Sequence, residues 1–322
     1  MLDISTLLYG GATFVLAAVI SCYTVLVFLS PPLVIASDND RRYRCRTNPD
    51  KPVSLPSIHD PAEVDLTVVI PAYNETERMP TMLKATVDHL NSDKFSPRSY
   101  ELLIVDDGSK DGTSGLALDF AKENSGIEVR VVTLEKNQGK GGAVKHGMLH
   151  GRGRRLLMVD ADGASRFEDL ELLWKAMDEF VPNEDDSAIA IGSRAHLVKT
   201  EAVVKRSVVR NILMYGLHTI LRIVGVGHIR DTQCGFKLFS RRAAQLIFPY
   251  QHLRTWIFDV EILLLAKQLR IPVAEVPIEW HEVSGSKLNV VIDSLQMLRD
   301  LLILRANLLF GRWRAPPPAA RP

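Results

Sequence analysis

The chain has 322 residues, and its 39 Lys and Arg side chains nearly balance 38 Asp and Glu, for a formal net charge of +1. Proteins that bind nucleic acids usually carry a clear basic excess, so this balance argues against a nucleic-acid partner. Hydrophobic residues make up 46% and charged residues 24%, which excludes a disordered chain. The three cysteines form no CxxC pair, which argues against a disulfide framework and a cysteine-bound zinc ion.

The first long segment, residues 7–29, contains no charged residue. A helix of this length spans about 34 Å, enough to cross the roughly 30 Å hydrocarbon core of a bilayer. The alternative is a cleaved signal peptide, but no positive region precedes the run, which also exceeds the usual length of about 7–15 residues. We therefore predict an N-terminal transmembrane anchor over residues 1–32.

Basic residues gather after the apolar run and set its expected orientation. By the positive-inside rule they place the C-terminal bulk of the chain in the cytosol, with the N-terminus outside or in a lumen. Residues 33–64 are polar and contain four prolines, so we expect a linker from the membrane to a folded domain. The basic residues are Arg41, Arg42, Arg44, Arg46 and Lys51.

Five short apolar runs follow and predict strands. Segments able to hold a helix separate the first four, for example residues 79–90 and 112–123. This alternation favours an α/β fold whose mostly parallel sheet is covered by helices on both faces. Ligands of such sheets bind beyond the carboxyl ends of the strands. The runs are Leu66–Ile70, Leu102–Val105, Val129–Leu134, Leu156–Val159 and Ala188–Ile191.

Acidic side chains follow three of these strands. The first strand runs into Glu75, and the second runs into Asp106 and Asp107. The fourth runs into Asp160 and Asp162, which point the same way if the chain is extended there. Carboxylates at one edge repel each other unless a cation lies among them, and two hard oxygens suit Mg²⁺ or Mn²⁺. Such a pair alone more often caps a helix, so its place at the sheet edge carries the metal interpretation.

Two neighbouring features at this edge need their own interpretation. Asp106 and Asp107 are adjacent, so we expect one to face the ligand and the other to stabilise the turn at Gly108. Residues 137–143 are glycine-rich and basic and open a predicted helix. This loop either cradles an anion or forms a closely packed helix N-terminus, and it matches neither the P-loop nor the GxGxxG spacing.

Taken in order, these motifs resemble the family 2 glycosyltransferases, which have the Rossmann-like GT-A fold. PAYNE, VDDGSKDGT, KNQGKGGA and DADGA carry the resemblance across residues 66–165. GSRAH, RDTQCGFKLF, WIFDVE and SGSKL, with the single N-terminal membrane helix, resemble the branch of that family that transfers glucose to dolichyl phosphate. The resemblance extends to about residue 314 and implies a catalytic domain over residues 65–285.

The resemblance implies an inverting enzyme that moves glucose from UDP-glucose to dolichyl phosphate for N-glycan precursor assembly, on the cytosolic face of the endoplasmic reticulum membrane. Two alternatives stay open: a synthase of the same fold that uses GDP-mannose, and a nucleotide-sugar-binding membrane protein without catalysis. A divalent ion on Asp160 and Asp162 would bridge the donor diphosphate and offset the leaving-group charge. By likeness, the donor-binding residues are Pro71, Tyr73, Glu75, Asp106, Asp107 (at the uracil imide) and Lys140.

The acceptor that the resemblance implies is itself a phosphate. Its second pKa is about 6, so it is mostly dianionic at neutral pH and has less need of a general base. The site must instead capture it with cations, for which Arg194, Arg230, Lys237 and Lys287 are candidates, unless they form surface ion pairs. Asp231 is the candidate orienter or base on the acceptor side, with Arg194 as its catalytic partner. Its rivals, Asp259 and Glu261, stand two apart on a predicted helix, so at most one of them should reach the site.

Two further stretches, residues 203–226 and 289–310, mix apolar and basic residues. Basic amphipathic helices suit a membrane interface, and Trp313 follows the second stretch as a possible anchor. A core-packing helix is the alternative for that stretch. We expect residues 286–322 to form a C-terminal amphipathic segment, which either contacts membrane lipid or packs onto the core.

Overall fold

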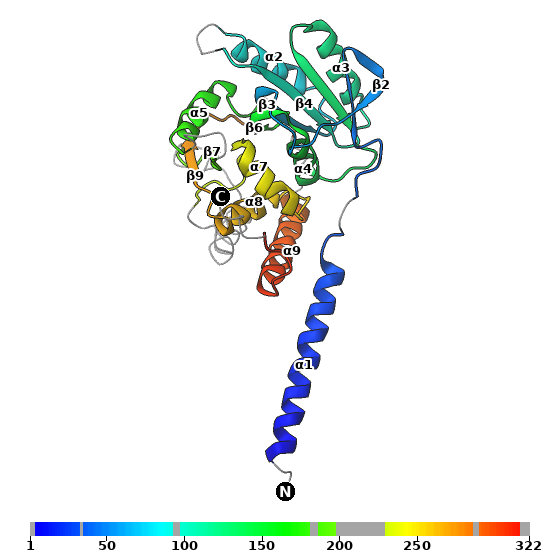
Figure 1. Ribbon diagram of the computed structural model, residues 1–322, viewed down its shortest axis with the longest axis vertical. Coiled ribbons are helices and arrows are strands. Elements are labelled where there is room, and N and C mark those ends of the chain that lie inside the picture. Colours follow the sequence, from blue (N-terminus) through cyan, green and yellow to red (C-terminus); the bar gives the residue numbers. More distant parts are fainter. Residues whose placement is uncertain are drawn as a thin grey trace.

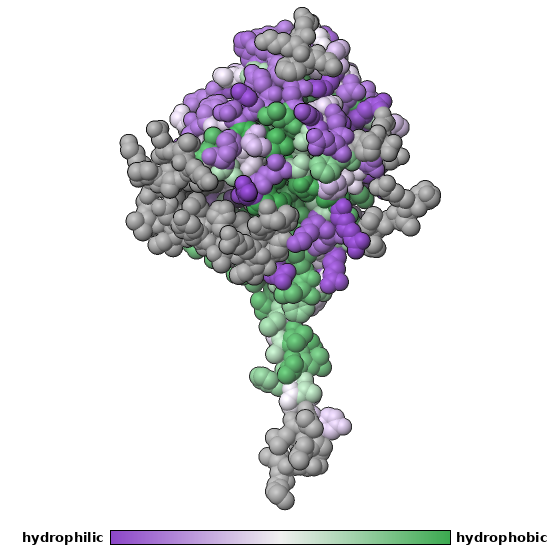
Figure 2. Space-filling view, turned by 90° about the vertical axis from the view of Figure 1, so that its left-hand side faces the viewer, coloured by the Kyte–Doolittle hydropathy of each residue, from purple (hydrophilic) through white to green (hydrophobic). Residues whose placement is uncertain are grey.

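The computed structural model describes residues 4–32, 35–92, 97–180, 186–197, 229–285 and 290–315. Helix α1 (Ile4–Leu29) projects from the rest of the molecule as a stalk (Figure 1). By length and composition, its residues Gly11–Leu29 are able to cross a membrane, and only 6% of that stretch is buried. Figure 2 shows apolar surface along the stalk and largely hydrophilic surface on the domain above it.

The described residues form a nine-stranded sheet in the order β2-β1-β5-β4-β3-β6-β8-β7-β9. Its four central strands, β5, β4, β3 and β6, are parallel, as predicted. Strand β8 runs antiparallel to both β6 and β7, and β9 is parallel to β7, so the whole sheet is mixed. The bounds are β3 (Val64–Ala72), β4 (Tyr100–Asp106), β5 (Glu128–Thr133), β6 (Gly153–Val159), β7 (Ile189–Ser193), β8 (Phe236–Ser240) and β9 (Val273–Pro277).

Both faces of the central sheet are buried, because successive side chains of a strand point to opposite faces. In β3, Val68 and Ile70 pack into one hydrophobic cluster, while Val69 between them packs into another. The first cluster includes helices α2 (Met79–Leu90), α3 (Thr113–Glu123) and α5 (Leu170–Asp178). The second includes α4 (Lys140–His150), α7 (Arg241–Ile247), α8 (Phe258–Gln268) and α9 (Val290–Leu309).

The prediction of a linker over residues 33–64 is wrong for its middle part. Strands β1 (Arg42–Cys45) and β2 (Asn48–Ser54) form a hairpin, and β1 pairs antiparallel with β5. Pro49 and Pro52, which suggested a linker, lie in the edge strand β2, where a missing N–H is tolerated.

Candidate active site

The carboxyl ends of β4 and β6 lie on either side of the end of β3 (Figure 1). Asp106 pairs in register with Ala72, and Asp160 directly follows β6. The predicted gathering of acidic residues at one edge is therefore present. It brings together chain segments that are more than 50 residues apart in sequence.

The Asp160 carboxylate pairs with the ammonium of Lys140 and lies against the backbone at Gly235. The ammonium of Lys140 lies 2.6 Å from Oδ1 and 2.8 Å from Oδ2 of Asp160, and only the Oδ2 contact has hydrogen-bond geometry. A Cβ atom at Gly235 would overlap this carboxylate, so a larger residue there would displace the Asp160 side chain. The pair ties the start of α4 to the end of β6.

Asp162 lies close enough to Asp160 for their charges to interact. Burial and the Asp160 carboxylate raise the pKa of Asp162 above its ordinary value. Its Oδ1 accepts a 3.0 Å hydrogen bond from Ala164 N–H. Its Oδ2 lies 3.9 Å from the guanidinium of Arg78, which also pairs with Glu75 through two hydrogen bonds.

Asp106 and Asp107 diverge as predicted. Asp106 accepts from Ser109 N–H at 2.8 Å and from the hydroxyl of Ser114, so it stabilises the turn. Asp107 is 3% exposed and accepts from the N–H groups of Gln138 (2.6 Å) and of the next residue, Gly139 (2.9 Å). Burial raises the pKa of Asp107 to about 7.

The glycine-rich loop is a closely packed helix start and does not offer a free anion cradle. The N–H groups of Gly141 and Gly142 donate to the carbonyl of Arg254 at 2.8 and 3.3 Å. The preceding N–H groups bind Asp107, as above. Gly139 and Lys140 are adjacent, so the loop joins the carboxylate beyond β4 to the carboxylate beyond β6. This loop brings Asp107, Asp160 and Lys140 into one site.

The assignment of Lys237 to the acceptor phosphate is contradicted by its burial. Its side chain is 0% exposed, and its ammonium lies 2.6 Å from Asp259 and donates to the Cys234 carbonyl. Lys237 lies on β8 inside the core, where the ion pair satisfies its charge. Asp259 and Glu261 point to different sides, as expected, and Glu261 accepts from the backbone of His252 instead.

Arg194 and Asp231 form a two-pronged ion pair at the end of β7. The guanidinium donates at 2.7 and 2.8 Å to the two carboxylate oxygens, and Arg194 N–H adds a third bond. Burial alone would raise the pKa of Asp231, but the hydrogen bonds and charge of Arg194 hold it below its ordinary value. Glu275 accepts from Asp231 N–H, and Trp280 lies 5.3 Å from the guanidinium.

The remaining predicted residues differ in their accessibility. Pro71 is buried in β3, Tyr73 is 38% exposed and Arg230 is exposed. Lys287 and the stretch 203–226 lie outside the described residues.

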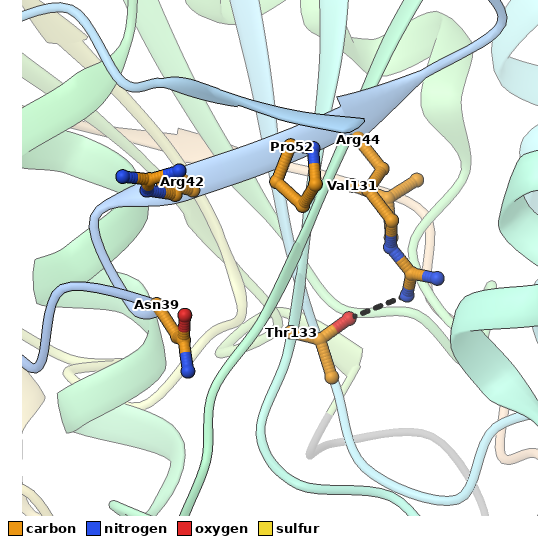
Figure 3. A pocket seen from close by; sticks show the side chains of 6 residues that line it. All are labelled: Asn39, Arg42, Arg44, Pro52, Val131 and Thr133. Carbon is orange, nitrogen blue, oxygen red and sulfur yellow. Dashed lines mark hydrogen bonds between the residues drawn. The ribbon is translucent and has the colours of Figure 1, made fainter. Parts of the chain in front are cut away.

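Sequence reasoning missed the hairpin's link to this edge. Arg44 of β1 donates to the Thr133 hydroxyl at 3.0 Å, Thr133 bonds the Ser114 hydroxyl at 2.7 Å, and Ser114 binds Asp106. Figure 3 shows the first of these bonds beside a small surface pocket between the hairpin and β5. Strands β4 and β3 separate the β5 side of this pocket from β6, and the pocket's lining residues are Asn39, Arg42, Arg44, Pro52, Val131 and Thr133.

Sequence reasoning also missed two arginines at the site, Arg78 and Arg254. Arg78 lies within one turn of the PAYNE motif, so its spacing offered a signal. Arg254 acts through its carbonyl, which any residue type supplies, so no sequence signal marks it.

The donor set at Asp160 and Asp162 fits a divalent ion. The Lys140 ammonium already lies against both oxygens of Asp160, and burial together with the Asp160 carboxylate raises the pKa of Asp162, which a bound cation would counteract. Within the described residues, no group of three or more His, Cys, Asp or Glu side chains is placed to hold a metal. An ion here would thus have two protein carboxylates and complete its shell with water and phosphate, as Mg²⁺ and Mn²⁺ do.

Comparison with known proteins assigns the class. Residues 67–248, more than half of the chain, match the family model for glycosyl transferase family 2. The chain belongs to this family, and its mixed sheet with helices on both faces is the GT-A fold. This confirms the predicted fold class.

Similar proteins show to which branch of family 2 the chain belongs. The chain is 46% identical over 319 residues to a dolichyl-phosphate beta-glucosyltransferase of Saccharomyces cerevisiae, with 94% of each chain covered. It is 46% identical over 263 residues to the Homo sapiens protein of that name, with 81% of each covered. Within family 2, the chain therefore belongs to the dolichyl-phosphate beta-glucosyltransferases, and it is an enzyme.

Among solved structures, the fold is similar to glucosyl-3-phosphoglycerate synthase from Mycobacterium tuberculosis in complex with Mn²⁺, UDP and glucosyl-3-phosphoglycerate. The TM-score is 0.50 at 18% identity, with 75% of this chain and 80% of that chain covered. At this identity the likeness concerns the fold alone.

Proposed function

We propose that this enzyme transfers glucose from UDP-glucose to dolichyl phosphate, with inversion, and that Asp160 and Asp162 hold the Mg²⁺ or Mn²⁺ ion of the donor. The names of its relatives support the acceptor and the sugar. The observation that carries the donor assignment is the single edge where Asp107, Lys140 and Asp160 are joined by one loop. An oxygen of the acceptor phosphate bonds to C1 of glucose, and the bond from C1 to the UDP oxygen breaks.

The donor half of the site binds a nucleotide diphosphate. Asp107 would accept a hydrogen bond from the uracil imide N–H, while Tyr73 and the neighbouring backbone border the base. A divalent ion, when bound, supplies positive charge to the diphosphate as it leaves. Lys140 and Arg78, which pair with Asp160 and Glu75 in this structure, are placed to donate to the same phosphates.

The acceptor half needs positive charge more than it needs a base. Dolichyl phosphate is mostly dianionic at neutral pH, so its oxygen is already a nucleophile. Arg194 and the exposed Arg230 are our candidates for holding it. The lowered pKa of Asp231 and its pairing with Arg194 suit an orienting carboxylate, which keeps the guanidinium in place, rather than a proton acceptor.

The membrane brings the acceptor to the site. Leu295, Leu302 and Leu309 recur every seven residues on α9 and are 61–67% exposed, so they form one apolar face. The end of α9 meets α1, where Asn307 donates to Ser30 at 3.0 Å. This supports α9 as an interfacial helix beside the transmembrane anchor. The basic residues after the anchor support a catalytic domain on the cytosolic face of the endoplasmic reticulum, with the N-terminus lumenal.

The test is a donor competition with the full chain in vesicles that contain dolichyl phosphate. Labelled UDP-glucose and GDP-mannose are supplied side by side, with and without EDTA. We expect glucosyl transfer that depends on a divalent ion, with Mg²⁺ and Mn²⁺ then compared directly. A preference for GDP-mannose would contradict the donor, and full activity in EDTA would contradict the metal assignment.

A further inference from the structure

Residues 251–257, which we call the connecting segment, lie between α9 and the glycine-rich loop and bond to both. On the loop side, the carbonyl of Arg254 accepts from Gly141 N–H at 2.8 Å, and Gln251 donates to the Gly141 carbonyl at 2.9 Å. These bonds are at the start of α4, next to Lys140. The position of the connecting segment therefore determines the position of the Lys140 backbone, from which the side chain extends.

The contact leaves no free space. Gly139 has a φ of +81°, and a Cβ atom there would lie 2.6 Å from the Arg254 carbonyl oxygen. A Cβ at Gly141 would lie 3.0 Å from the carbonyl carbon of Arg254. In so tight a contact, a shift of the connecting segment moves the loop with it, because closely packed groups cannot absorb the displacement.

On the other side, α9 holds the connecting segment through a buried carboxylate. Asp300 is 2% exposed, and its Oδ2 accepts a 2.6 Å hydrogen bond from the Thr255 hydroxyl. Its Oδ1 accepts from Arg299 at 2.8 and 3.0 Å. A buried acid on a helix is costly unless it is bonded in this way, so this contact is specific.

A second contact joins the same partners beyond the end of α9. The ring of Trp313 stacks on His252 with a centroid distance of 4.4 Å and an angle of 7°. His252 is fixed from behind by Glu261, whose carboxylate accepts its N–H at 2.9 Å. Trp313 is only 6% exposed, so it acts as a packed support for the connecting segment and not as a free membrane anchor.

We propose that Asp300 and Trp313 are positioning residues for the donor loop: through Thr255 and His252 they fix the connecting segment, and so Gly139–Gly142 with Lys140. This inference rests on the proposed function, because it assumes that this loop binds the donor. It makes α9 a part of the donor site through the connecting segment. The same helix carries the apolar face assigned above to the membrane.

The experiment measures UDP binding by the purified full chain in detergent with Mn²⁺, using calorimetry. Thr255→Val and Asp300→Ala remove the hydrogen bond singly and together, and Thr255→Ser keeps the hydroxyl. Thr86→Val is the matched control, because Thr86 is also buried but bonds only within α2, to Met82. Kinetics give KM for UDP-glucose and for dolichyl phosphate, and hydrogen exchange follows the backbone of residues 139–143.

We expect Thr255→Val and Asp300→Ala each to weaken UDP binding about threefold to tenfold. The double variant should bind UDP no more weakly than the more affected single variant. KM for UDP-glucose should rise by the same factor, KM for dolichyl phosphate should change less than about twofold, and residues 139–143 should exchange faster. Thr255→Ser should bind like wild type.

UDP binding by Thr255→Val equal to that of Thr86→Val, or additive effects in the double variant, would overturn the inference. Failure of the wild-type chain to bind UDP with Mn²⁺ would instead refute the proposed donor.

Discussion

The ammonium of Lys140 lies between the two carboxylate oxygens of Asp160, at 2.6 and 2.8 Å. A divalent ion bound by Asp160 would need the same oxygens. Under the proposed function, the ammonium and the ion therefore compete for this carboxylate, and Lys140 turns to the donor phosphates when the ion binds.

Lys140→Met removes that competitor. We expect the variant to bind Mn²⁺ about threefold to tenfold more tightly without nucleotide, and to bind UDP more weakly in the presence of Mn²⁺. Titration of free Mn²⁺ by electron paramagnetic resonance measures the first effect. Lys122→Met, which breaks an exposed pair with Asp119 at 2.7 Å, is the control and should change neither affinity. Weaker Mn²⁺ binding by Lys140→Met would show that the two do not compete.

The raised pKa of Asp107 leads us to expect that nucleotide binding depends on pH. Burial raises its pKa to about 7, so it becomes protonated as the pH falls through that value. A protonated carboxyl accepts a hydrogen bond from the uracil imide N–H less well, so UDP affinity should fall about tenfold from about pH 8 to about pH 6. Calorimetry over this range measures it. Asp107→Asn should bind UDP weakly and lose this part of the pH dependence; an unchanged pH profile in that variant would exclude Asp107 as its source.

A series of hydrogen bonds leads from Arg44 of the hairpin to Asp106. It predicts that a substitution in the hairpin affects binding of the donor. Arg44→Met should raise KM for UDP-glucose about threefold, because Thr133 and Ser114 then hold Asp106 less firmly. Thr133→Val should have the same effect, and the two changes together should not add. Arg42→Met is the control, since Arg42 lines the same pocket but has no part in this series of hydrogen bonds. Equal kinetics for Arg42→Met and Arg44→Met would contradict this role.

Because Lys237 is buried in an ion pair, we expect its substitution to reduce the stability of the protein rather than its binding of substrate. Lys237→Met leaves the Asp259 carboxyl without its ion-pair partner in the core, which costs about 3–5 kcal/mol of unfolding free energy. The double variant Lys237→Met/Asp259→Asn should recover much of this loss. Denaturant unfolding of the full chain in detergent measures both. If Lys237→Met kept wild-type stability but bound dolichyl phosphate more weakly, Lys237 would be a direct acceptor ligand after all.

The apolar runs and the motifs at their ends predicted the central strands and the site edge. Strands buried on both faces leave a continuous apolar signal, so Leu102–Val105 and Leu156–Val159 were recognisable. The hairpin was missed because Pro49 and Pro52 suggest a linker, and an edge strand with exposed side chains has no apolar pattern to oppose that reading.

The contacts that the site residues make were less predictable from the sequence than the identity of those residues. The spacing of Asp259 and Glu261 on a helix correctly indicated opposite directions, because that depends on local geometry alone. The burial of Lys237 depends on packing between β8 and α8, which are distant in sequence. The contact of Thr255 with Asp300 is of the same kind, since a hydroxyl and a carboxylate 45 residues apart leave no local signal.

The most direct test of the central claim is glucosyl transfer by Asp162→Asn. This change keeps the shape of the side chain and removes the charge that the ion requires. With labelled UDP-glucose and dolichyl phosphate in vesicles, the account predicts a loss of kcat/KM of about a hundredfold or more, with the thermal unfolding midpoint retained. Transfer by Asp162→Asn at the wild-type rate would contradict it.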